Sequence, residues 1–155
     1  MGTRSRIGVM HGDKVKSVYC HWDGYLAHNG AILQEHFDSA KANNLVALGD
    51  LSTLRPEIGE AHAFSYHDLP KDEVEAFKAT TANMCTFYGR DRGEPNSVPN
   101  IFPNVAEFVN EFGEEYNYLF INGTWFVNDH GATLGDNPVL DMVEQVIEDR
   151  ESEDA

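Results

Sequence analysis

The chain has 155 residues and a formal net charge of −15 at pH 7, with 26 acidic residues against 11 Lys and Arg. Its hydrophobic fraction of 41% and aromatic fraction of 11% exclude a chain that stays disordered under this charge. This length fits a single domain with a substantial core. No apolar run has the length of a signal-peptide core or a membrane span, so we expect a cytoplasmic protein without a membrane partner.

The first segment predicts a β-hairpin that turns at Gly12-Asp13. This turn places His11 opposite Lys14 and thereby determines the register of both strands. One face is then apolar and carries Ile7, Val9, Val18, Cys20 and Trp22. The other face is cationic and aromatic, where Arg6 lies opposite Tyr19 and Arg4 opposite His21, with Ser17 beside them.

Short helices and strands follow this hairpin. Asn29 as a cap predicts a short helix through Phe37, and Asp38 or Ser39 as a cap predicts another that ends at Gly49. A loop with one short strand at 61–66 comes next, and a helix opened by Pro70 runs over 70–79. Apolar and aromatic residues then predict a strand over 84–88.

The second half of the chain begins with a Pro- and Asn-rich stretch at 95–103, which predicts a long loop. A helix over 103–112 follows, with Gly113 as its stop signal. Asn122-Gly123 is a strong signature of a two-residue turn, so residues 116–129 predict a second hairpin that pairs Ile121 with Thr124. Both of its faces are largely apolar, which indicates either the centre of a covered sheet or an interaction surface.

The chain ends in a helix that we expect to begin at 136–138 and to bury an apolar stripe through Ile147. Beyond Ile147 the residues are almost all acidic. We therefore expect one domain over residues 1–147 and a disordered acidic tail over 148–155. The expected fold class is α+β: an antiparallel sheet of two hairpins and one or two further strands, packed with four to five helices.

The basic residues of the first hairpin stand apart in this acidic chain, because residues 1–22 hold four basic side chains against Asp13 alone. Arginine supplies phosphate charge and a stacking plane, and bases stack on aromatic rings. We therefore predict a surface that binds single-stranded DNA, made of Arg4, Arg6, Lys16, Tyr19, His21, Trp22, Tyr25, Arg90 and Arg92.

Within this surface the arginines of the first strand would contact phosphates, and the rings of Tyr19, Trp22 and Tyr25 would stack on bases. The segment 90–94 would extend the positive track. The plainer alternative is that these rings are core residues and that the arginines form ion pairs with the surplus carboxylates.

Catalytic and metal chemistry finds less support. Cys20, His21, Asp23 and His28 are close in sequence, but adjacent strand residues point to opposite faces, so Cys20 and His21 cannot both ligate one ion without a bulge. Neither Cys20 nor Cys85 lies in an activating motif. We expect no cofactor, no metal and no enzymatic activity, with a small hydrolase or transferase as the third alternative. Whether Cys20, His21 and Asp23 form a site or are structural stays open.

The acidic end of the chain admits three interpretations. It is a solvated helix end, or a tail that recruits a partner such as an RNA polymerase or another host or phage protein and competes with nucleic acid. In the third, the whole acidic surface mimics DNA and inhibits a host DNA-binding or defence factor. The aromatic second hairpin also predicts a homo-oligomer.

Three strings carry a family resemblance: Thr3-Arg4-Ser5, then Tyr19-Cys20-His21-Trp22-Asp23-Gly24-Tyr25, then Arg90-Asp91-Arg92-Gly93-Glu94. With them, the chain resembles over most of residues 3–126 a family of small, mostly uncharacterised proteins of tailed phages. It is also similar to the single-stranded-DNA-binding transcription cofactor of N4-like phages, which works with the phage RNA polymerase. The resemblance implies a phage protein in the cytoplasm of an infected bacterium that binds nucleic acid or a host factor.

Overall fold

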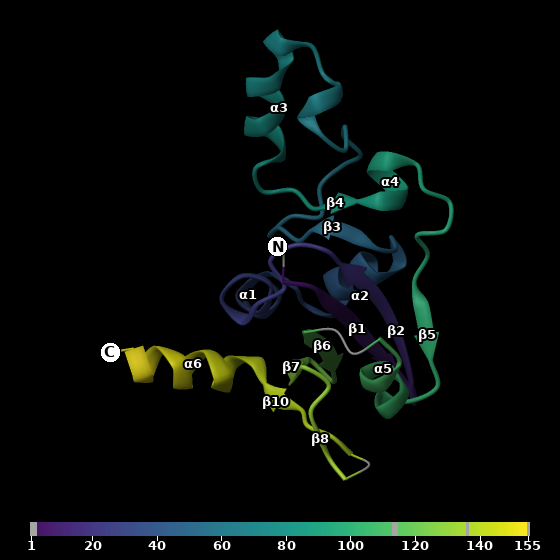
Figure 1. The fold of residues 1–155 in the computed structure, drawn as a ribbon, viewed down its shortest axis with the longest axis vertical. Helices are drawn as coiled ribbons and strands as arrows, with labels where there is room; N and C mark the ends of the chain where they lie inside the picture. Colours follow the sequence, from purple (N-terminus) through teal and green to yellow (C-terminus); the bar gives the residue numbers. More distant parts are fainter. Residues whose placement is uncertain (1–2, 113–114, 136, 155) are drawn as a thin grey trace.

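The structure is a computed structural model that describes residues 3–112, 115–135 and 137–154. Its fold is α+β and is built around one mixed sheet of eight strands (Figure 1). These strands are β1 (Ser5–His11), β2 (Lys14–Cys20), β3 (Leu51–Thr53), β4 (Thr86–Phe87), β5 (Asn100–Phe102), β6 (Tyr116–Ile121), β7 (Thr124–Asp129) and β10 (Asp141–Met142). A separate small sheet pairs β8 (Thr133–Leu134) with β9 (Asn137–Pro138).

Six α-helices occur in the described part of the chain: α1 (Ala31–His36), α2 (Ser39–Ala47), α3 (Val74–Thr81), α4 (Tyr88–Arg92), α5 (Val105–Phe112) and α6 (Val143–Asp154). A π-helical turn, Leu26–Gly30, leads directly into α1, so this helical segment begins before the predicted start at Asn29. No helix among the described residues has the length and apolar character that crossing a bilayer requires.

Both predicted hairpins are confirmed with their registers. His11 pairs with Lys14 in the first hairpin, and Ile121 pairs with Thr124 in the second. Asn122 and Gly123 have φ angles of 47° and 86°, as a two-residue turn of the primed type requires. The residues of each turn therefore predicted the register of its hairpin correctly. Burial of the apolar face favours the same register, since a one-residue slip would move every apolar side chain to the opposite face.

The two hairpins meet through a parallel pairing of β1 with β6, so the predicted antiparallel sheet is wrong in this respect. The strand order is β10-β7-β6-β1-β2-β3-β4, with β5 paired to β2 off this path. β2 and β3 are also parallel. Helix-containing connections separate these pairs in the chain, and such connections permit parallel neighbours. Besides the two hairpins, the sheet contains β3, β4, β5 and β10, whereas the sequence predicted only one or two further strands.

The sheet buries both of its faces. On one face Ile7 and Val18 pack against α1 and α2, which contribute Leu33 and Leu45 to the larger core. On the other face a smaller core contains Val15, Phe102, Phe108, Val109 and Leu119 from β2, β5, α5 and β6. The second hairpin therefore lies inside a covered sheet, and its aromatic residues no longer support the expectation of a homo-oligomer.

Two predictions for the middle of the chain differ from the structure. The segment 61–66 is not a strand, and the strand of this region is β3, ten residues earlier. The predicted loop at 95–103 contains β5, which pairs with β2 through Phe102 opposite Val15. Phe102 is 6% exposed, so β5 forms because it closes the smaller core. The residues of β5 alone could not predict this strand, because its partner β2 is distant in the sequence.

The C-terminal helix begins later than predicted. Residues 137–138 and 141–142 are short strands, and α6 begins at Val143; Asp136 and Gly113 lie outside the described residues. The helix then continues to Asp154, over most of the segment for which the sequence predicts disorder. In Figure 1 α6 extends outward from the sheet toward the C-terminus.

The segment between β3 and β4 forms an arm that projects from the sheet and carries α3 (Figure 1). α3 has no buried residue, although its helical span lies close to the predicted 70–79. The arm returns to the body at a bridge between Glu57 and Met84. Its position is therefore determined by the contacts at its base, where Asp91 and Arg90 bind the backbone of residues 58–62.

Of the two predicted caps of α2, Asp38 and Ser39, it is Asp38 that makes the contact: its carboxylate accepts the backbone N–H of Lys41 at 2.9 Å. We expect Asp38→Ala to lower the free energy of unfolding by about 1 kcal/mol, because the first turn of α2 loses its cap. Urea denaturation measures this loss. Asp38→Asn is the matched control, since the amide oxygen also caps and should leave stability nearly unchanged; an equal loss in both variants would contradict the capping role.

Candidate nucleic-acid interface

Three of the residues predicted for the DNA-binding surface, His21, Trp22 and Tyr25, lie on the turn that follows β2, residues 21–25. Asp23 adopts a left-handed φ of 55°, and the backbone N–H of Gly24 donates to the carbonyl of Thr3 at 2.7 Å. From the second hairpin, the hydroxyl of Tyr118 donates to the carbonyl of Gly24 at 2.7 Å. The turn is thus held from two sides by segments distant in the sequence.

Gly24 is required at this position because the N-terminal strand lies directly against it. A Cβ atom there would lie 2.7 Å from the Cβ of Ser5 and 2.9 Å from the carbonyl oxygen of Thr3. Such distances cannot be relieved by a flexible side chain, because the neighbours are backbone or near-backbone atoms. The close contact aligns residues 3–5 with the turn and brings Arg4 to its edge.

Two large rings remain accessible on this turn: Trp22 is 43% exposed and Tyr25 is 41% exposed. The imidazole of His21 packs edge-on against Trp22, with ring centroids 4.6 Å apart. His21 Nδ1 also lies 2.8 Å from the hydroxyl of Tyr19, which orders these side chains in a row. Trp22 leaves the apolar face predicted for it because β2 ends at Cys20 and the strand alternation ends with it.

Arg4 and His21 lie close enough to influence one another. Partial burial, and to a smaller extent the positive charge of Arg4, lower the pKa of His21. The imidazole is therefore neutral at pH 7 and can accept or donate a hydrogen bond without adding charge. Arg4 itself is exposed, so it supplies the positive charge at this edge of the surface.

Arg6, by contrast, is only 4% exposed. Its guanidinium donates to the side-chain oxygens of Asn100 at 3.0 Å and Ser17 at 3.5 Å, and it lies 5.9 Å from the centroid of Phe102. Arg6 does pair with Tyr19 as the register predicted. However, β5 covers this part of the face, so Arg6 connects β5 to the hairpin instead of pointing to solvent.

Asp50 is part of this region, although sequence reasoning did not select it. Its carboxylate accepts the backbone N–H of Tyr19 at 2.9 Å and so satisfies the edge of β2 where β5 no longer reaches. Burial raises the pKa of Asp50, while this hydrogen bond and the charge of Arg6 lower it in part. The only local signal was a Gly-Asp pair after a helix, which marks a cap and not a contact with another strand.

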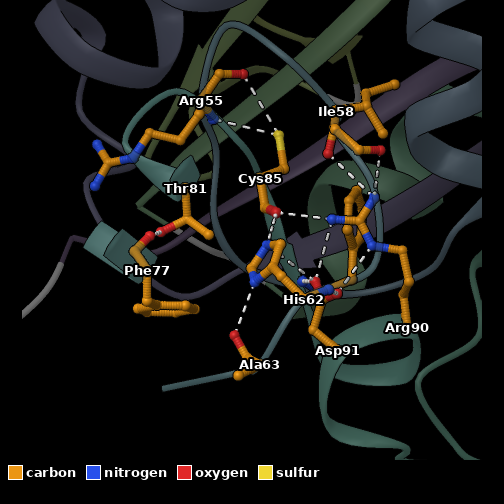
Figure 2. Close-up of polar contacts among 11 residues, drawn as sticks. Arg55, Ile58, His62, Ala63, Phe77, Thr81, Cys85, Arg90 and Asp91 are labelled. Atoms are coloured by element: carbon orange, nitrogen blue, oxygen red, sulfur yellow. Dashed lines mark hydrogen bonds and ion pairs between the residues drawn. The ribbon is translucent and has the colours of Figure 1, made fainter. Parts of the chain in front are cut away.

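Arg90 belongs to the base of the arm, where Asp91 is the central acceptor (Figure 2). The Asp91 side chain is fully buried and accepts the backbone N–H groups of His62 at 3.0 Å and Phe87 at 2.8 Å. Arg90 Nε donates to the same carboxylate at 3.0 Å. The remaining Arg90 donors reach the carbonyls of Ile58 at 3.1 Å and Cys85 at 2.9 Å.

The contacts of Arg90 and Asp91 with residues 58–62 and 85–87 form what we call the Asp91 clamp. The guanidinium of Arg90 is bound within this clamp, so it is not directed to a ligand. Arg92 is half-exposed and pairs with Glu94 at 3.2 Å, and its guanidinium lies 5.0 Å from the ring centroid of Phe64. The alternative of ion pairs therefore describes the segment 90–94. Lys16 lies toward the other end of β2, separated from Trp22 by six residues.

The side chains of Cys20, His21, Asp23 and His28 do not gather around one point. Cys20 lies in the core, and His28 Nδ1 is 2.8 Å from the side-chain oxygen of Asn29. Within residues 3–112, 115–135 and 137–154, no three His, Cys, Asp or Glu side chains are grouped so that they could hold a metal ion.

Both thiols are buried. Burial raises the pKa of Cys20 to about 12, against a weaker opposing effect of its hydrogen bond with Asn29. Burial likewise raises the pKa of Cys85 to about 11, although the backbone hydrogen bond with Arg55 lowers it in part. Because the thiolate is the reactive form, neither cysteine is prepared to act as a nucleophile at neutral pH.

No protein-family model, no curated protein and no solved structure matches this chain. The resemblance carried by the three strings therefore stays a prediction.

Asp50 makes the stability of the fold depend on pH. A raised folded-state pKa means that ionisation costs stability, so its contribution falls as pH rises from its ordinary value of 3.8 through the folded-state value. We expect Asp50→Asn, which keeps an acceptor for Tyr19, to gain stability relative to wild type as the pH is raised above the ordinary Asp50 pKa of 3.8, because only the wild-type carboxyl then ionises at a cost. Urea denaturation of both proteins at a series of pH values measures this gain. Asp72→Asn is the control, because it removes one charge from an exposed position. A stability difference between Asp50→Asn and wild type that does not change with pH would contradict the prediction.

The cysteines should resist alkylation in the folded protein. At pH 8 their thiolate fractions are lower than those of free cysteines by about a hundredfold or more, so iodoacetamide should react correspondingly more slowly than in urea. Mass spectrometry of timed samples measures both sites. Rapid native labelling of either Cys20 or Cys85 would instead restore a cysteine nucleophile as a hypothesis.

Proposed function

We propose that the protein binds single-stranded DNA through the exposed rings of Trp22 and Tyr25, with Arg4 contacting a phosphate. The observation that carries this proposal is the exposure of both rings, 43% and 41%, on one rigid turn. A domain that buries rings as large as Phe87 and Tyr118 completely has left these two at the surface. Aromatic rings beside an arginine are the elements that single-stranded nucleic acid binding requires.

The expected affinity is limited by charge. Each stacked base contributes about 1–3 kcal/mol, but the net charge of −15 repels a polyanion outside the immediate surface. Burial of Arg6 and the internal contacts of Arg90 leave fewer cations for phosphates than the sequence predicted. The contact is therefore short, covering few nucleotides and weakening as salt is added.

The acidic helix α6 supplies a regulatory element to this proposal. Glu144, Glu148 and Asp149 are exposed on it, and the helix extends from the body (Figure 1). It can compete with DNA for the basic surface or recruit a partner such as an RNA polymerase. The setting is the cytoplasm of an infected bacterium, in keeping with the phage resemblance.

A second candidate is an acidic inhibitor that occupies a host DNA-binding or defence protein. It is favoured by the contacts of the charged residues that the structure describes. Arg6, Arg90 and Lys41 make internal contacts, whereas most of the described carboxylates are exposed and form no ion pair with Lys or Arg. Such a protein would show no affinity for DNA and would be recovered with a basic host protein.

Substitution of the exposed rings tests the proposal. Trp22→Ala and Tyr25→Ala should each weaken binding of a fluorescent single-stranded oligonucleotide by about 5- to about 150-fold, which corresponds to one lost stack. Fluorescence anisotropy at low salt measures the affinity. Tyr66→Ala is the matched control, because Tyr66 is also 43% exposed but lies on the arm, and it should leave binding unchanged.

The absence of binding by the wild-type protein at low salt would exclude the proposal and favour the inhibitor. Equal weakening by Tyr66→Ala would show that the assay reports nonspecific contact. Arg6→Ala is not informative here, because removing a buried and hydrogen-bonded arginine also destabilises the sheet.

A further inference from the structure

A second basic feature lies at the tip of the first hairpin. The register pairs His11 with Lys14, and it pairs Lys16 with Ile101 of β5. Directly paired residues point to the same side of a sheet, and so do Lys14 and Lys16 at alternate positions of one strand. The four side chains therefore share one face, beyond the part of the sheet that α1 and α2 cover.

These four residues line a cavity of about 280 Å³. Ile101 is 65% exposed and forms its apolar wall, while the other three lining residues carry nitrogen donors. His11 and Lys14 are exposed and Lys16 is partly exposed, so all three can reach a ligand from solvent. The lining contains no carboxylate.

The lysines of this cavity are not used by the fold. Among the described side chains, the cations that take part in no hydrogen bond, ion pair or ring contact are Arg4, Lys14, Lys16 and Lys71. Two of these four line one cavity. This chain has 26 acidic residues, so a lysine with a purely structural role would be expected to pair with a carboxylate. Lys14 and Lys16 share one face, and neither has such a partner in the part of the chain that the structure describes.

The surrounding charge also favours an anion. Asp13 is the single acidic residue among residues 3–22, and it lies in the turn itself. On the face of the cavity, the residues paired with Lys16 are Val9 of β1 and Ile101 of β5, and neither carries a charge. Within residues 3–22 the positive charge of the two lysines is therefore offset by Asp13 alone, whereas the net charge of −15 disfavours anions on the chain as a whole.

We propose that His11, Lys14 and Lys16 form a binding site for a phosphoryl group. Lysine binds phosphate as a compact point charge with several donors, and two ammonium groups match the charge of a phosphate monoester. The imidazole adds a further N–H donor, and Ile101 offers an apolar surface for the organic part of the ligand. The group can come from inorganic phosphate or a monoester, or from the phosphodiester backbone of DNA.

This site is separate from the proposed stacking surface. Lys16 and Trp22 are six residues apart on an extended segment, which corresponds to about 20 Å. A failure of one site therefore does not predict a failure of the other. The experiments below test them with different probes and different variants.

Backbone amide NMR of the full chain, titrated with inorganic phosphate against sodium chloride of equal ionic strength, tests the site. We expect saturable shifts at residues 11–17 and 100–102. Lys14→Ala/Lys16→Ala should weaken the response by about tenfold to about a hundredfold, because two charged hydrogen-bond donors are lost. The absence of saturable shifts in the wild type, or an unchanged response in the double variant, would overturn the proposal.

Lys71→Ala/Lys78→Ala is the matched control, since it removes the same charge from the exposed arm and should leave the phosphate response unchanged. An equal loss in this control would also overturn the proposal, because it would show a response to net charge alone. Lys14→Arg/Lys16→Arg keeps the charge and should retain the response, which separates loss of the ligand from loss of the fold.

A single-stranded oligonucleotide without a terminal phosphate distinguishes the two sources. If it shifts residues 11–17 in the wild type and in Trp22→Ala, the site takes phosphodiesters independently of stacking. If only inorganic phosphate shifts them, the site takes a small phosphorylated ligand. Loss of oligonucleotide binding in Trp22→Ala with the phosphate response intact would confirm that the two sites are independent.

Discussion

The parallel pairing of β1 with β6 is the contact on which the rest of this structure depends. It brings two hairpins from opposite ends of the chain into one sheet, beginning where Ser5 pairs with Tyr116. It also places Tyr118 beneath the turn at residues 21–25, where its hydroxyl holds the carbonyl of Gly24. The candidate DNA surface is thus supported by a hairpin almost a hundred residues away, and its exposed rings lie on a rigid base.

The covering of both faces of the sheet determines which basic side chains of this acidic chain are buried and which stay exposed. Closing the second face with β5 and α5 encloses Arg6, and the arm requires Arg90 for the clamp around Asp91. A buried guanidinium needs acceptors: Arg90 donates to the Asp91 carboxylate and to carbonyls of the arm base, and Arg6 donates to the side-chain oxygens of Asn100 and Ser17. Of the described cations without a side-chain partner, Arg4 lies at one end of the first hairpin, and Lys14 and Lys16 lie toward the other.

Local signals were reliable where a short-range rule operates. Gly12-Asp13 and Asn122-Gly123 gave both turns, and Asp38 gave the cap of α2, because each involves only neighbouring residues. Predictions from local sequence were wrong where contact with a segment distant in the chain determines the structure. β5 was expected to be a loop, because its composition favours turns and only the pairing with β2 and the burial of Phe102 make it a strand. Asp50 was missed for the same reason.

The sequence by itself therefore determined the two hairpins, their registers and the excess of basic residues near the N-terminus, since turn chemistry and strand alternation act over a few residues. Only the tertiary structure decided which of those residues are accessible. Arg6 and Trp22 exchanged their expected environments: β5 covers the arginine, and the end of β2 releases the ring. The physical reason is that alternation assigns a side chain to a face, whereas exposure depends on which distant segment covers that face.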